Sequence, residues 1–177
     1  TVVIGENKFA LHIMPSGAVR QGTVCVIGNG VVVDPAVLLG EIESLAQKGN
    51  QLTGRLFISE NAHVVLDYHK TEDMLREKSL GKNKIGTTAR GIGPCYADKI
   101  GRSFAVRMAD FRDTAELKQK LGRIIEYKNK VFSAVYNAEP ISLDEVYDKC
   151  LHYADSFAGY IQNTTRLLHE AIDQKKS

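Results

Sequence analysis

The chain has 177 residues, of which 44% are hydrophobic and 25% charged, and its formal net charge at pH 7 is +2. This length is sufficient for one domain with a buried core, and so small a charge argues against a nucleic-acid partner. No apolar run approaches the 18 residues of a membrane span. Cys25, Cys95 and Cys150 lack metal-binding spacing and indicate reduced, buried thiols. We therefore expect a cytoplasmic protein with no nucleic-acid or membrane partner.

Short strands are predicted throughout the first third of the chain. Residues 2–4 and 8–13 flank a Gly-Glu-Asn turn at 5–7 and are expected to form a hairpin. Residues 23–27 form an apolar segment bounded by glycines, which is typical of a strand buried in a parallel sheet. Further strands are predicted at 31–33, 56–59 and 64–66.

Helices are predicted between and after these strands. Asp34 and Pro35 form a strong helix start, because aspartate caps free N–H groups and proline suits the first helical position. This helix is expected to end at Gly49. From residue 113 the chain is predicted to be helical, and the Ser142-x-x-Glu145 capping box opens one of the helices. Their apolar faces comprise Leu117, Leu121, Ile124, Lys128 and Val131, then Val146, Cys150, Ala154, Phe157 and Ile161, then Leu167, Leu168, Ala171 and Ile172.

Three potential metal ligands lie close together in a helix predicted over 67–79. Asp67 and His69 have ligand chemistry, but Asp73 does not add a third ligand at a suitable spacing. We therefore predict no metal site here. Asp67 is expected to cap the helix, and His69 is expected to make a structural hydrogen bond.

The stretch 85–102, IGTTARGIGPCYADKIGR, combines four glycines with basic and hydroxyl side chains. Glycine lets the backbone approach a ligand closely, hydroxyl and backbone N–H groups donate hydrogen bonds, and the arginine fork matches phosphate oxygens. We predict an anion-binding loop over 80–94, followed by a helical turn from Tyr96. The alternative is a solvated glycine-rich turn. The donor side chains are Thr87, Thr88, Arg90, Lys99 and Arg102.

Two common phosphate motifs are absent from this stretch. The pair 81–82 reads Gly-Lys but is followed by Asn83, so no Walker-type loop is present. The Gly-x-Gly at 91–93 reaches Tyr96 where a dinucleotide fingerprint requires its third glycine. The loop therefore belongs to neither class.

Residues 91–102, GIGPCYADKIGR, fit the pattern G-I-G-P-x-Y-x-x-K-x-x-R. This segment resembles the second signature of adenylosuccinate synthetases, the GTP-dependent enzymes of AMP synthesis. The similarity continues in the family's order at HIMPSG (12–17), IGNGVVVDP (27–35), LDYH (66–69) and REK (76–78). It therefore covers nearly the whole chain.

The resemblance implies a reaction and a set of site residues. In that family the γ-phosphoryl of GTP is transferred to O6 of IMP and displaced by L-aspartate, with Mg²⁺ on the phosphates. By position, Thr88 would bind the IMP phosphate, Arg102 would reach the IMP of the neighbouring subunit of a homodimer, and Thr1 would adjoin the GTP site. Supporting roles are inferred from position for Thr87, Arg90, Lys99 and Arg107.

Two positions depart from the family pattern. Ala89 stands where glycine is common, and it would be strained if its φ were positive. A one-residue insertion near 103–106 affects the assignment of Arg107.

The resemblance places the family's phosphate loop, catalytic base, catalytic histidine and magnesium ligands before Thr1, and its guanine- and aspartate-binding elements after Ser177. We therefore expect 1–177 to be a single partial domain of a larger α/β fold, with mostly parallel strands in the first third and helices in the last. It would contain no catalytic or metal-binding residue and would be inactive alone. The alternative is a non-catalytic segment that binds a nucleotide phosphate or mediates dimerisation.

Overall fold

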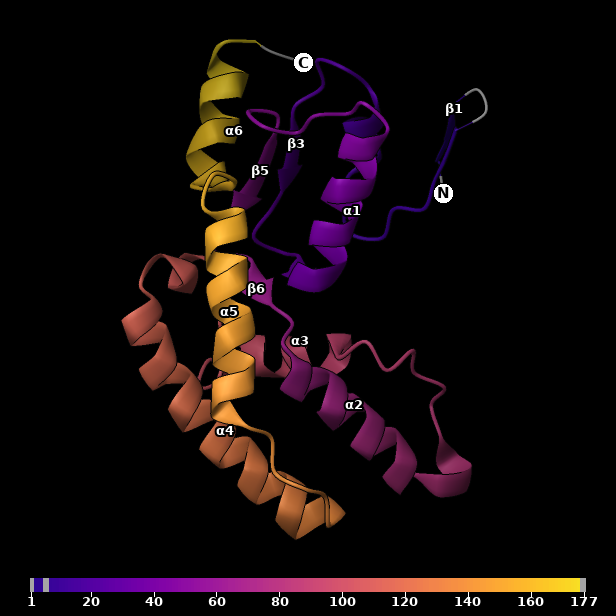
Figure 1. Cartoon of the computed structure of the whole chain (residues 1–177), viewed down its shortest axis with the longest axis vertical. Coiled ribbons are helices and arrows are strands. Elements are labelled where there is room, and N and C mark those ends of the chain that lie inside the picture. Colours follow the sequence, from indigo (N-terminus) through magenta and orange to yellow (C-terminus); the bar gives the residue numbers. More distant parts are fainter. Residues whose placement is uncertain (1, 5–6, 176–177) are drawn as a thin grey trace.

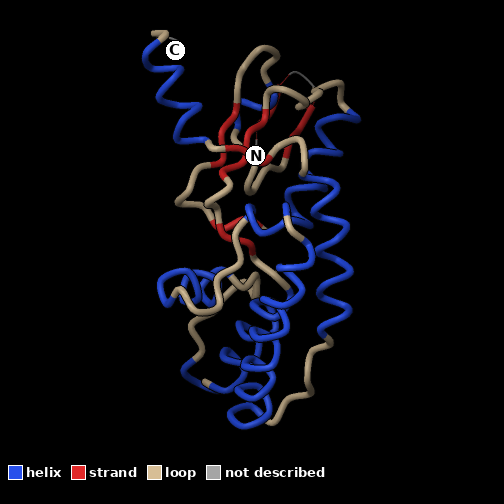
Figure 2. The backbone as a smooth tube through the Cα atoms, turned by 90° about the vertical axis from the view of Figure 1, so that its left-hand side faces the viewer, coloured by secondary structure: helices blue, strands red, loops and turns tan. Residues whose placement is uncertain are grey.

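The computed structural model describes residues 2–4 and 7–175. The molecule is elongated, with most of its strands gathered toward the end where both termini lie, while α2 and α4 extend to the other end and α3 lies between (Figures 1 and 2). The helices are α1 (Pro35–Gln47), α2 (Asp67–Ser79), α3 (Ile92–Gly101), α4 (Thr114–Tyr136), α5 (Leu143–Phe157) and α6 (Thr164–Asp173), with short 3₁₀ turns at Ser16–Val19, Gly81–Asn83 and Met108–Arg112.

The strands are short and form three small sheets. Strands β3, β5 and β7 pair in parallel in that order, and β4 pairs in parallel with β6. Strands β1 and β2 pair antiparallel, which confirms the predicted hairpin pairing. The turn residues Gly5 and Glu6 lie outside the described residues. The strands are β1 (Val2–Ile4), β2 (Asn7–Phe9), β3 (Cys25–Ile27), β4 (Val32–Val33), β5 (Leu56–Ser59), β6 (His63–Val64) and β7 (Ile161–Gln162).

The α/β class and the largely parallel strand order confirm the predicted fold. At the N-terminal hairpin, β2 spans Asn7–Phe9, whereas the predicted strand ran from residue 8 to residue 13. One continuous apolar core joins the sheets to the helices, and its largest fully buried side chains include Tyr68, Phe132 and Phe157. None of the described helices is long and apolar enough to span a bilayer.

The ends of α1 follow the predicted chemistry. The Asp34 carboxylate accepts hydrogen bonds from the N–H groups of Ala36 at 3.1 Å and Val37 at 3.3 Å, so Asp34 is the N-cap. Gly49, just after the C-cap Lys48, has φ +81°, a conformation that strains other residues. The start and stop of this helix are therefore both confirmed.

The predicted cap of α2 is wrong. Leu66 occupies the N-cap position and Asp67 is the first helical residue, where its carboxylate pairs with Lys149 at 2.6 Å. A carboxylate within the first turn still interacts favourably with the helix dipole. In α5 the predicted cap is confirmed, since the Ser142 hydroxyl accepts from the Glu145 N–H at 3.3 Å.

Two members of the predicted apolar stripes differ from the prediction, one in its element and one in its contacts. Ile161 is not on α5, which ends at Phe157, but begins β7, where it pairs with Ile58 of β5. Lys128 is buried on α4, but it is part of an ion-pair network. The remaining members of the α4 stripe are buried, except Val131, which is half-buried.

Candidate functional site

The glycine-rich loop joins α2 to α3. Helix α3 begins at Ile92, four residues before the predicted start, and Gly91 is its N-cap with φ +73°. Proline is tolerated in the first turn of a helix, so Pro94 does not delay the start. The predicted 80–94 loop is thus shorter than expected and consists of a 3₁₀ turn at Gly81–Asn83 followed by residues 84–91, which we call the 84–91 loop.

The centre of the 84–91 loop presents free donors to solvent. Thr87, Thr88 and Arg90 are exposed. Among the described residues, the N–H groups of these three have no hydrogen-bond partner, whereas the Ala89 N–H contacts the Thr87 hydroxyl at 3.4 Å. Ala89 has φ +52°, and this positive φ means that its backbone is strained.

The other predicted basic residues lie apart from this loop. The Lys99 ammonium group donates to the carbonyl oxygens of Asn29 at 3.1 Å and Gly30 at 2.9 Å. The spacing of three between Lys99 and Arg102 would place both on one face of a helix, but Arg102 is the C-cap of α3 with φ +63°, so the two do not share a helical face. Its side chain is exposed. Arg107 donates to the side-chain oxygen of Asn61 at 3.3 Å.

The turn that Lys99 contacts lies at the carboxyl ends of two parallel strands. Asn29 follows β3, and its side-chain oxygen accepts from the hydroxyl of Ser59, the last residue of β5, at 2.5 Å. The Tyr96 hydroxyl donates to the Gly30 carbonyl at 3.0 Å. Helix α3 is therefore fixed to the edge of the sheet where ligands of open α/β folds usually bind. Thr1, the residue predicted beside the GTP site, lies outside the described residues.

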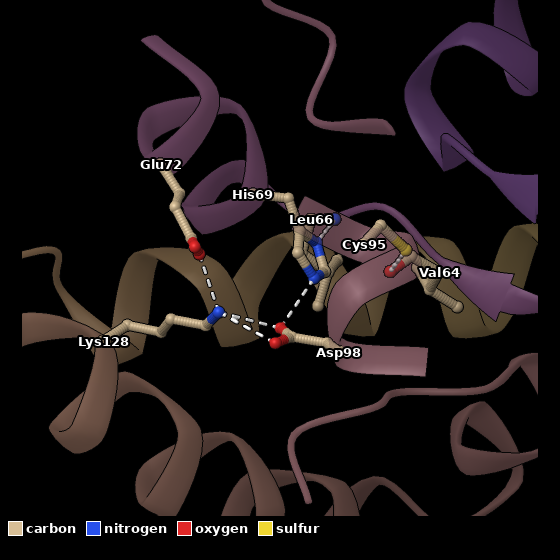
Figure 3. A network of polar contacts seen from close by, with 7 residues as sticks. All are labelled: Val64, Leu66, His69, Glu72, Cys95, Asp98 and Lys128. Carbon is tan, nitrogen blue, oxygen red and sulfur yellow. Dashed lines mark hydrogen bonds and ion pairs between the residues drawn. The ribbon is translucent and has the colours of Figure 1, made fainter. Parts of the chain in front are cut away.

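A buried network of charges lies beneath α3 and was not predicted. The Lys128 ammonium group donates to Glu72 at 2.7 Å and to Asp98 at 3.0 Å (Figure 3). The other oxygen of Asp98 lies 3.2 Å from Nε2 of His69. Nδ1 of His69 accepts the Leu66 N–H at 3.0 Å, which confirms the predicted structural hydrogen bond. An acceptor Nδ1 requires the proton on Nε2, so His69 is neutral and donates to Asp98.

Burial and hydrogen bonding oppose each other in this network. Burial alone would raise the pKa of Asp98, but hydrogen bonds from His69 and Lys128 outweigh it and keep that pKa below its usual value. Burial would lower the pKa of Lys128, yet its bonds to Glu72 and Asp98 raise it. Burial lowers the pKa of His69 despite its contact with Asp98. The network is thus a charged lysine between two carboxylates.

His63 on β6 is a second buried histidine that the sequence did not single out. Its Nδ1 atom has no hydrogen-bond partner within 2–4 and 7–175. Burial, together with the nearby cations Lys99, Arg107 and Lys120, lowers its pKa to about 4. It is therefore neutral at pH 7.

No group of three His, Cys, Asp or Glu side chains is arranged to bind a metal ion in the described part of the chain. Asp67, His69 and Asp73 instead contact protein groups, namely Lys149, Asp98 and the Gly91 N–H. These three side chains therefore form no magnesium site in the part of the chain that the structure describes.

The arrangement is that of an α/β protein that presents a glycine-rich loop with free N–H donors next to a helix start. Comparison with known proteins defines the family. A model of the adenylosuccinate synthetase family matches residues 1–177. The chain is 47% identical over 176 residues to an adenylosuccinate synthetase of Streptomyces griseus and 45% identical over 177 residues to one of Acetivibrio thermocellus. These alignments cover 99% and 100% of this chain and 41% of each relative.

A solved structure agrees with the sequence relatives. The fully ligated adenylosuccinate synthetase of Plasmodium falciparum superposes with a TM-score of 0.86 at 29% identity, over 99% of this chain and 40% of that one. The chain belongs to the adenylosuccinate synthetase family. It spans about two fifths of the length of the relatives it matches.

Proposed function

We propose that the full-length protein is an adenylosuccinate synthetase, which joins IMP and L-aspartate at the expense of GTP, and that the 84–91 loop binds the IMP phosphate. The observation that carries this proposal is the set of free N–H groups at Thr87, Thr88 and Arg90. These donors lie immediately before the N-terminus of α3, whose dipole favours an anion. Family membership supplies the reaction and substrates.

Each donor in the loop suits a phosphate oxygen. The Thr88 hydroxyl and the backbone N–H groups would donate to the phosphate dianion, and the exposed Arg90 guanidinium would add a charge-assisted bond. Lys99 acts indirectly in this proposal, because its ammonium group is used to fix the Asn29–Gly30 turn to α3. Arg107 would be a supporting residue near the carboxyl end of β5, because it donates to Asn61, two residues after that strand.

The remaining chemistry would be carried out by parts of the full-length protein outside these 177 residues. Bound Mg²⁺ would neutralise the phosphate charge of GTP, but its ligands, the catalytic base and the catalytic histidine are not assigned to any residue described here. Thr1 would adjoin the GTP site. The chain is then one partial domain, without synthetase activity when isolated.

The three cysteines support our proposal of a cytoplasmic location. Cys25, Cys95 and Cys150 are buried free thiols, and burial raises the pKa of Cys95 and Cys150 to about 12. Thiols in this state are inert structural residues. Unpaired cysteines are typical of a reducing compartment.

The test of phosphate binding is Thr88→Val in the full-length protein. Loss of one charge-assisted hydrogen bond is expected to raise the KM for IMP roughly tenfold to a hundredfold. The KM values for GTP and L-aspartate should change little. Thr53→Val is the matched control, because Thr53 is exposed and its hydroxyl has no partner in the described structure. An unchanged KM for IMP in Thr88→Val would refute the assignment.

We further propose that Arg102 binds the IMP of the neighbouring subunit in a homodimer. The partly exposed apolar residues Ile92, Tyr96 and Ile100 recur every four residues along α3, and Arg102 lies two residues after Ile100. Tyr96 contributes only its exposed part to this row, because its hydroxyl bonds to the Gly30 carbonyl. Ile100 is 76% exposed, and a row of exposed apolar side chains on one helix is typical of an interaction surface. A two-fold interface would bury this face in both copies and carry each Arg102 across it.

Mixing two variants that are each impaired in IMP binding, and assaying at an IMP concentration where neither is active alone, tests this arrangement. If a site takes Thr88 from one subunit and Arg102 from the other, a heterodimer of Thr88→Val and Arg102→Ala has one intact site. Random exchange of subunits should then restore about a quarter of the wild-type sites. No recovery, with exchange verified by mass, would contradict a shared site. The alternative function is a segment that dimerises or binds a phosphate but catalyses no reaction. In that case the full-length wild-type protein would have no synthetase activity, and Ile100→Asp would abolish only its dimerisation.

A further inference from the structure

Three side chains on one face of α2 contact the segment that follows it. His69, Asp73 and Glu77 are spaced four residues apart and therefore lie in a row along the helix. Glu77 Oε1 accepts the Gly86 N–H at 2.6 Å, and Asp73 Oδ2 accepts the Gly91 N–H at 3.0 Å. His69, the next in the row, contacts Asp98 in the middle of α3.

The contact at Gly91 is close as well as polar. Asp73 is only 8% exposed, so its bond to the Gly91 N–H is shielded from water. A Cβ atom at position 91 would lie 2.7 Å from the backbone carbonyl carbon of His69 and from the backbone nitrogen of Lys70. The loop backbone therefore rests directly on the backbone of α2 at this point.

Residues 87–90 are the part of the loop between these two anchored glycines. The N–H groups of Gly86 and Gly91 are already bonded to carboxylates, so they are not available to a phosphate. The donors that remain are the N–H groups of Thr87, Thr88 and Arg90. Two bonds from one rigid helix thus limit both the position of the loop and the number of its free donors.

We propose that Asp73 and Glu77 are positioning residues, which fix the ends of the loop so that residues 87–90 are arranged for a phosphate before it binds. This inference rests on the proposed IMP site, because it concerns how that site is arranged. A preformed site avoids the cost of ordering the loop on binding. Without the anchors, the same donors must be ordered by the ligand itself, and affinity falls.

Glu77 provides the sharper test because it is half-buried, so its replacement should not unfold the protein. In the full-length protein, Glu77→Ala removes the acceptor and should raise the KM for IMP about tenfold, with little change in kcat or in the KM for GTP. Glu77→Gln keeps a carbonyl acceptor and should restore the KM to within about threefold of wild type. Asp73→Asn should behave like Glu77→Gln.

Glu43→Ala is the matched control, since Glu43 is exposed on α1 and makes no ion pair in the described structure. An unchanged KM for IMP in Glu77→Ala would overturn the inference. Equal KM increases in Glu77→Ala and Glu77→Gln would also overturn it, because they would indicate a role for the charge and not for the accepted N–H.

A ligand-free measurement separates this inference from the proposed function. Amide hydrogen exchange at Gly86 should be faster in Glu77→Ala than in wild type, whatever the loop binds. If Thr88→Val leaves the KM for IMP unchanged while Gly86 exchange accelerates, the IMP assignment fails and the anchor stands. If Thr88→Val raises the KM and Gly86 exchange in Glu77→Ala equals wild type, the anchor fails and the IMP assignment stands.

Discussion

Lys128 of α4 and Asp98 of α3 form a buried ion pair, with 2.9 Å between the ammonium nitrogen and a carboxylate oxygen. The same ammonium group bonds to Glu72 of α2 (Figure 3). Three helices therefore meet at one buried positive charge. Removing the charges from water is costly, so the pair does not by itself guarantee a net gain in stability. Removing only one partner leaves the others uncompensated.

Lys128→Met should therefore destabilise the protein strongly. The methionine fills much of the space, but the Asp98 carboxylate loses its cation in a site from which water is excluded. Breaking such a pair costs about 3–5 kcal/mol of unfolding free energy. Denaturant unfolding of the full-length protein measures the loss.

Lys130→Met is the control for this prediction. Lys130 pairs with Glu126 on the exposed face of the same helix, and their side chains are 71% and 68% exposed. Solvent screens such a pair, so no measurable change is expected. If Lys128→Met and Lys130→Met lose similar amounts of unfolding free energy, the buried network contributes no more to stability than an exposed ion pair.

Lys128 also shows where prediction from the sequence reaches its limit. Its position in an apolar stripe was predicted, because the stripe follows from local helical spacing. Its partners, Glu72 and Asp98, lie 56 and 30 residues earlier in the chain. Nothing in the local sequence around residue 128 brings those helices together, so the network became visible only in the fold.

Helix ends with a local chemical signature were predicted well, as at Asp34 and Gly49. The start of α3 was predicted too late, because a glycine N-cap and Pro94 resemble loop residues. Strand β7 was missed, since two residues carry no periodicity and its strand character comes from pairing with β5, about 100 residues earlier in the chain. Short strands of this kind depend on tertiary context.

The candidate site also has one part that could be predicted from the sequence and one part that could not. The motif at 91–102 is contiguous, so its resemblance to the family could be found from the sequence alone. The anchors Asp73 and Glu77 were not found, because their acceptor role depends on how the loop folds back onto α2. Helical spacing of four between acidic residues is common on solvated faces and indicates no contact by itself.

His63 should make stability depend on pH between about 4 and 6.5. Its pKa is lowered from 6.5 to about 4 by burial first and then by Lys99, Arg107 and Lys120, with Asp110 opposing. In this window the unfolded chain binds more protons than the folded one, so stability rises with pH and is lost as pH falls. One such group contributes a slope of up to about 1.4 kcal/mol per pH unit.

His63→Gln should flatten this dependence, because glutamine does not titrate. Urea unfolding at several pH values between 4 and 7 measures the slope in each variant. His169→Gln is the matched control, since His169 is exposed on α6. If the dependence of unfolding free energy on pH is as steep in His63→Gln as in wild type, the assignment to His63 is contradicted. Part of the dependence should remain in every variant, because the pKa of His69 is also lowered.

Gly91→Ala should be destabilising for two reasons. The residue has φ +73°, and the added Cβ would lie 2.7 Å from the α2 backbone, which has no side chain that can rotate away. Strain of this kind costs about 1–3 kcal/mol, and the clash adds to it. Gly93→Ala is the control, because a Cβ there meets nothing within 4 Å and alanine favours the helix. In thermal unfolding, the Tm of Gly91→Ala should be well below that of wild type, and the Tm of Gly93→Ala should equal or exceed it.

Ala89→Gly should relieve strain in the loop. Ala89 has φ +52°, and the left-handed region costs an L-residue roughly 1–2 kcal/mol, whereas glycine adopts it freely. Glycine also makes the unfolded chain more flexible, which opposes the gain. Ala97→Gly on the exposed face of α3 carries the same unfolded-state effect without any left-handed strain to relieve. Ala89→Gly is therefore expected to be at least about 1 kcal/mol more stable than Ala97→Gly in denaturant unfolding, and equal losses in the two variants would mean that Ala89 is not strained.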